Sequence, residues 1–76
     1  MNQSTQYILE AAKLQRQYLE EFKGDVVAER DALTKLINDE VLRVTGAKDI
    51  CDATNNFEVY AKAMYDATMK VMGEEK

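Results

Sequence analysis

The sequence predicts an all-α protein, a small three-helix bundle with up-down-up topology and a short extra helical turn between the second and third helices. The chain of 76 residues contains no proline and only three glycines, so it has few residues that interrupt a helix. Residues of high helix propensity dominate it. Apolar residues recur at intervals of three and four in three long segments, which Gly24 and Gly46 separate.

The first helix is expected at about residues 4–23, with Ser4 or Thr5 as its N-cap. Its apolar side chains cover an arc of roughly 160°, which is wider than the stripe that a single neighbour requires. They are Tyr7, Ile8, Ala11, Ala12, Leu14, Tyr18, Leu19 and Phe22. We therefore expect this helix to contact more than one neighbour.

The second helix is expected at about residues 25–45, with Asp25 as its N-cap and Gly46 at its end. Gly24 is a plausible left-handed C-cap of the preceding helix, which gives a tight turn between antiparallel helices. The alternative is one long helix through Gly24, at a cost of about 1 kcal/mol. The expected core stripe consists of Val26, Leu33, Leu36, Ile37, Val41 and Val44.

The connector from about Gly46 to Asn56 is expected to contain one short helical turn, with Ile50 and Cys51 tucked beneath it. A free cysteine in such a place most simply behaves as a small buried apolar residue.

The third helix is expected at about residues 56–72 and ends at Gly73. Asn55 can cap it, with Glu58 reaching back as in a capping box. Ala61 and Ala67 lie on its apolar stripe and allow a neighbouring helix to approach closely. The three helices form a single domain over residues 1–76. A domain of this size buries only about 60% of its unfolded surface, so stabilisation by oligomerisation is expected.

The composition excludes several classes of chemistry. Without histidine and with a single cysteine, the chain cannot build a common zinc site, a Ser-His-Asp relay or an internal disulfide. Adjacent carboxylates on a helix diverge by about 100°, so the acidic doublets do not make a catalytic pair. We expect no catalytic residue, no cofactor, no metal and no enzymatic activity.

The net charge is −4, from 14 acidic and 10 basic residues. An acidic chain is poorly suited to direct nucleic-acid binding, which needs clustered Lys and Arg. Four acid-first pairs at i, i+4 are expected to neutralise cations locally. They are Asp31–Lys35, Asp39–Arg43, Glu58–Lys62 and Asp66–Lys70.

The first residues are polar and uncharged, without the basic and apolar regions of a signal peptide. No apolar run approaches the roughly 18–20 residues of a membrane span. We expect a cytoplasmic protein that does not bind membranes, with its native start and stop both present.

Several apolar side chains fall outside the expected core stripes and suggest a partner or oligomer interface, although scattered exposure is an equally simple explanation. They are Leu9, Leu42, Val59, Tyr65 and Met69. The acidic doublets provide a second candidate surface, which can attract a basic partner. Its residues are Glu20, Glu21, Asp39 and Glu40.

These features favour a non-enzymatic protein-interaction module. It would be a small acidic helical inhibitor or adaptor that occludes a protein partner, for instance a nucleic-acid-binding complex, as a homo-oligomer. An alternative is an oligomeric nucleotide-binding protein that uses Tyr and Lys or Arg at a subunit junction. A third hypothesis is a helix-turn-helix-like DNA-binding regulator, but the third helix begins with an acid, Glu58, among its polar residues.

Overall fold

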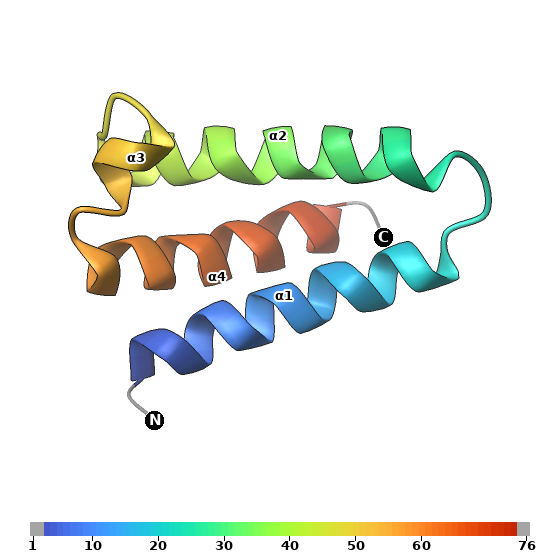
Figure 1. Cartoon of the computed structure of the whole chain (residues 1–76), viewed down its shortest axis with the longest axis horizontal. Helices are drawn as coiled ribbons and strands as arrows, with labels where there is room; N and C mark the ends of the chain where they lie inside the picture. The colour runs from blue at the N-terminus through green and yellow to red at the C-terminus, as the bar shows by residue number, and fades with distance from the viewer. Residues whose placement is uncertain (1–2, 75–76) are drawn as a thin grey trace.

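The computed structural model describes residues 3–74, which form four helices and no strand. The helices are α1 (Gln3–Glu21), α2 (Val26–Thr45), α3 (Ile50–Ala53) and α4 (Phe57–Glu74). The three long helices run up, down and up, and α3 is a single turn between α2 and α4 (Figure 1). The predicted all-α three-helix bundle with its short extra turn is therefore confirmed.

The last helix along the chain occupies the middle of the structure. In Figure 1, α4 (orange to red) lies between α2 (green) and α1 (blue), and it packs along both. The two outer helices touch each other at few residues. Helix α1 contacts more than one neighbour, as expected, because it packs along α4 and also touches α2, where the Tyr18 hydroxyl donates to the Glu29 carboxylate at 2.8 Å. The molecule is a flattened slab of 36 × 28 × 19 Å with two broad faces.

The core is small and rich in alanine. Its larger members are Leu33, Ile37, Val41 and Val71, and its alanines are Ala11, Ala53, Ala61, Ala63 and Ala67. The three alanines of α4 allow α1 and α2 to approach it closely on opposite sides. The fully buried Thr68 donates a hydrogen bond to the Met64 carbonyl at 2.8 Å and accepts one from Gln15 Nε2 at 3.1 Å.

The turn between α1 and α2 is real, so the alternative of one continuous helix is wrong. The Asp25 carboxylate accepts a hydrogen bond from the Ala28 amide at 3.1 Å and caps α2 as predicted. Gly24 is not the left-handed C-cap that was predicted, because α1 ends at Glu21 and Gly24 lies farther along the turn with φ 142°. At the other end of α2, Gly46 adopts a left-handed conformation with φ 72°, and its amide bonds the Leu42 carbonyl at 2.9 Å.

The helix ends differ from the prediction at both ends of α1, which stops at Glu21 and not at about residue 23, and at both ends of α4. Helix α1 already begins at Gln3, so Ser4 and Thr5 lie inside it. The Gln3 side chain donates from Nε2 to the Tyr7 hydroxyl one turn later. Helix α4 is capped by Asn56, whose side chain accepts from the Val59 amide at 3.4 Å.

Asn55 is not the cap, because its own amide still bonds the Asp52 carbonyl of the α3 turn at 3.2 Å. At the far end, α4 continues through Gly73 to Glu74. A glycine in an exposed last turn costs only about 1 kcal/mol, so it does not have to end the helix.

The predicted core stripe of α2 is only half correct. Leu33, Ile37 and Val41 are buried, whereas Leu36 is 49% exposed, Val44 is 54% exposed and Val26 is also exposed. Helix α4 covers one side of the stripe, and the thin slab leaves the other side uncovered. In the connector, Ile50 packs against the core as expected, but Cys51 is exposed and not buried.

Candidate interaction surface

One broad face carries an apolar groove between α2 and α4. The groove holds about 290 Å³ and is lined by Val44, Glu58, Val59, Lys62, Ala63 and Asp66. Val44 and Val59 are each about half exposed there. We call the α2–α4 face the surface formed by these six residues together with Leu36, Glu40, Arg43 and Lys70.

Glu40 is the centre of an ion-pair network on this face. Its carboxylate pairs with the Arg43 guanidinium on the same helix and accepts a hydrogen bond from the Lys70 ammonium of α4 at 3.2 Å. The side chain of Glu40 is only 16% exposed. The hydrogen bond from Arg43, with a smaller contribution from Lys70, outweighs desolvation and lowers the pKa of Glu40 to about 2. Glu40 therefore remains an anion that binds α2 to α4.

A second ion pair lies beside it on α4. Lys62 Nζ donates to Asp66 Oδ2 at 2.7 Å and lies 5.6 Å from the centre of the Tyr7 ring. The hydrogen bond to Asp66 is the main cause that raises the pKa of Lys62.

The cations of this face do not pair as the local i, i+4 rule predicted. Arg43 binds Glu40, Lys62 binds Asp66, and Lys70 crosses to α2. Glu40 attracts two cations because its carboxylate lies between two helices, within reach of both. The ion-pair partners on this face therefore depend on which side chains the packing of α2 and α4 brings together, and not on spacing along one helix.

The α2–α4 face is electrically neutral. It contains three acids, Glu40, Glu58 and Asp66, and three bases, Arg43, Lys62 and Lys70. The chain as a whole has a charge of −4, so the excess acid lies elsewhere on the molecule.

The opposite broad face has a smaller hollow between α1 and α4. It holds about 190 Å³ and is lined by Ile8, Ala11, Ala12, Gln15, Tyr60 and Met64. Met64 and Asp66 are two residues apart on α4 and therefore point about 160° away from each other. The slab thus presents an apolar depression on each broad face.

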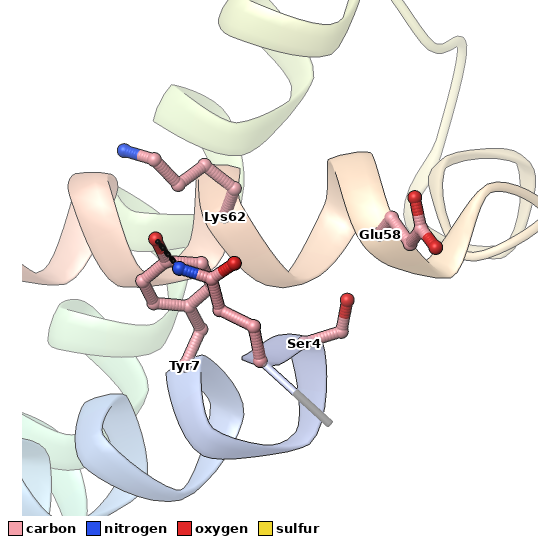
Figure 2. A pocket seen from close by; sticks show the side chains of 5 residues that line it. Ser4, Tyr7, Glu58 and Lys62 are labelled. Carbon is pink, nitrogen blue, oxygen red and sulfur yellow. Dashed lines mark hydrogen bonds between the residues drawn. The ribbon is translucent and has the colours of Figure 1, made fainter.

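A third depression surrounds Tyr7 near the start of α1. It holds about 400 Å³ and is lined by Gln3, Ser4, Tyr7, Glu58 and Lys62 (Figure 2). The Tyr7 ring packs against Tyr65 with centroids 5.2 Å apart, and its hydroxyl accepts from Gln3 Nε2 at 3.0 Å. Figure 2 shows the Lys62 ammonium extending away from Glu58. The one cation of the depression is already bound to Asp66, so the geometry gives the nucleotide-binding alternative no particular support.

The predicted interface residues lie on different parts of the molecular surface. Leu9, Val59 and Met69 are about half exposed, whereas Leu42 and Tyr65 are half-buried. Val59 faces the α2–α4 groove, and Met69 lies beside Met72 near α1. Leu9 is two residues from the buried Ala11 and therefore points away from α4. The structure does not bring these side chains into one patch.

The residues of the predicted acidic surface also lie apart from one another. Glu20, Glu21 and Asp39 are exposed, but Glu40 is held in its ion pairs. Glu20 and Glu21 lie at the end of α1, whereas Asp39 lies about 20 Å along α2 from the turn.

Sequence reasoning missed Leu36 and Val44 as surface residues. The position of Glu40 was a usable signal, because it lies midway between them at intervals of four residues. A charge within an apolar row indicates that this side of the helix is not deeply buried.

Comparisons with protein families, with curated proteins and with solved structures found no match to this chain. None of the helices in residues 3–74 combines the length and apolar character needed to cross a membrane. In the same range, no three acidic or cysteine side chains converge in a way that could hold a metal ion.

Proposed function

We propose that this chain is a non-enzymatic protein-interaction module, a small acidic helical inhibitor or adaptor that binds a protein partner and acts as a homo-oligomer. One observation carries the proposal. Within the described residues, eight large apolar side chains are between 42% and 60% exposed. The exposed ones are Leu9, Val26, Val27, Leu36, Val44, Phe57, Val59 and Met69.

Single exposed apolar side chains are ordinary, but eight on a domain of this size, with Val44 and Val59 sharing one groove, are typical of a surface that a partner covers. Such a chain gains stability when a partner covers them, because each buried apolar side chain contributes about 1.5–3 kcal/mol. The apolar depressions on both broad faces offer two places where a partner helix can pack.

A concrete version is an inhibitor of a nucleic-acid-binding complex. Outside the neutral α2–α4 face the chain has a net charge of −4, and Glu20, Glu21 and Asp39 are exposed. Negative surface of this kind attracts a basic protein surface that otherwise binds phosphates. Binding to such a partner should weaken as the salt concentration rises.

The test is an affinity capture from the native host with three variants. Val59→Glu places a charge in the α2–α4 groove, and Ala12→Glu places one in the α1–α4 hollow. Ala28→Glu is the matched control, because Ala28 is exposed and lies nine residues from the buried Ile37, on the opposite side of α2.

The proposal expects at least one protein that the unmodified chain and Ala28→Glu both retain and that Val59→Glu or Ala12→Glu loses. Its direct binding is then confirmed with purified components by calorimetry. If all four chains retain the same proteins in the same amounts, the proposed function is wrong.

A further inference from the structure

One ridge of α2 carries two exposed apolar side chains with a largely covered carboxylate between them. Leu36, Glu40 and Val44 follow one another at intervals of four residues, so they lie about 6 Å apart along this ridge. A two-fold axis that crosses the ridge at Glu40 places Leu36 of one copy opposite Val44 of the other, and the reverse contact is made at the same time.

Helix geometry allows this contact. When i, i+4 ridges of two helices interdigitate, the helices cross at about 50°, which is the commonest packing class. In that arrangement Leu36 of one copy lies over Val44 of the other. Val59, which shares the groove with Val44, enlarges the apolar area at each end of the contact.

The charges of the face favour a second copy over a charged partner. Two chains of charge −4 repel each other except where the approaching surfaces are neutral, and the α2–α4 face is the neutral part. Each Glu40 is already flanked by Arg43 and Lys70 of its own chain. The two-fold centre therefore does not oppose two bare anions. The extra cation that each chain brings there is balanced by Glu58 and Asp66, which together with Lys62 make the whole face neutral.

We infer that two copies of this chain form a two-fold dimer through the α2–α4 face, with the two α2 helices crossing at Glu40. This assignment rests on the function proposed above and names one partner of the interaction module. The acidic remainder of each chain and the α1–α4 hollow then stay available to a different protein.

The first test is sedimentation velocity of the purified chain over a hundred-fold range of concentration up to high micromolar. The chain is expected to be dimeric at the upper end. Leu36→Glu and Val44→Glu are each expected to raise the dimer dissociation constant about 10- to 100-fold, because a charge then enters an apolar contact. Leu9→Glu, on the outer side of α1, is the matched control and should leave that constant unchanged.

The second test traps the two-fold contact. In a Cys51→Ser background, the double change Leu36→Cys and Val44→Cys keeps the ion pairs of Glu40 and places each thiol opposite one of the other copy, so it is expected to give a disulfide-linked dimer in air. Leu9→Cys in the same background is expected to remain unlinked. Circular dichroism of every variant checks that the helices are retained.

The dimer is refuted if the unmodified chain is monomeric throughout, if Leu9→Glu dissociates it as strongly as Val44→Glu, or if the chain with Leu36→Cys and Val44→Cys fails to crosslink. The two experiments together distinguish failure of the dimer from failure of the proposed function. A monomeric chain that still loses a host protein through Val59→Glu or Ala12→Glu retains its function without self-association. A monomeric chain with no variant-dependent partner loses both.

Discussion

Glu40 of α2 and Lys70 of α4 form an ion pair, with Glu40 Oε1 and Lys70 Nζ 3.2 Å apart. The pair joins two helices whose residues are 30 positions apart in the sequence, and Arg43 completes it from the α2 side. The network links α2 to α4 beside the buried core residues Ile37, Val41 and Val71.

The first prediction concerns acid stability. The pKa of Glu40 is about 2 in the folded chain, against an ordinary value of 4.5. Its contribution to the free energy of unfolding is therefore complete above the ordinary value and is lost as the pH falls toward about 2. Glu40→Gln should make the decline across this window shallower. Urea unfolding at several pH values measures it, and equal slopes for the two chains would contradict the prediction.

The second prediction compares two neighbours on α2. Ile37 is 1% exposed and Leu36 is 49% exposed. Ile37→Ala should lower the free energy of unfolding by about 2–5 kcal/mol, because it leaves a cavity. Leu36→Ala should lower it by less than about 1 kcal/mol. Both are measured by denaturant unfolding in a Val44→Glu background, which keeps self-association out of the comparison. Equal losses would show that Leu36 belongs to the core.

The third prediction concerns the buried hydrogen bond between α1 and α4. Thr68→Val preserves the shape of the side chain but leaves the half-buried Gln15 amide without its acceptor. We expect a loss of about 1–2 kcal/mol of unfolding free energy. A double-mutant cycle with Gln15→Leu separates the bond from the packing. If the two changes prove additive, the hydrogen bond contributes nothing.

The fourth prediction distinguishes the two glycines with positive φ. A Cβ at Gly24 would lie 3.0 Å from the Phe22 ring in addition to requiring φ 142°, whereas a Cβ at Gly46 would meet nothing within 4 Å. Gly24→Ala should therefore cost more than Gly46→Ala, which we place at about 1 kcal/mol. Gly46→Asn should recover part of that loss, since asparagine tolerates the left-handed conformation. Thermal unfolding ranks the three variants, and the reverse order would contradict the turn geometry.

The helices themselves were predictable, because they depend on periodicity and on local caps. Asp25 and Gly46 perform the roles that their residue types and positions indicated. The short connector turn was predicted too, although its cap, Asp49, was not singled out. These features involve residues that are close in sequence, and local chemistry determines them.

Which side chains of each helix are buried by a neighbour was less predictable. An apolar stripe shows which side of α2 avoids water but not how much of it a neighbour covers, so Leu36 and Val44 were wrongly assigned to the core. The partners of Lys62 and Lys70 also depend on which helix lies beside α4. Both errors arise because α4 packs between α1 and α2. The spacing of residues within one helix does not show which helix lies in the middle.

The central place of α4 has a consequence for synthesis. The ribosome delivers α1 and α2 first, and these two helices have few contacts with each other. We expect them to form a loosely packed hairpin until α4 has been synthesised and packs between them. Folding of the nascent chain should therefore be late and nearly all-or-none. A premature stop codon before α4 would yield an unfolded fragment and not a smaller working version.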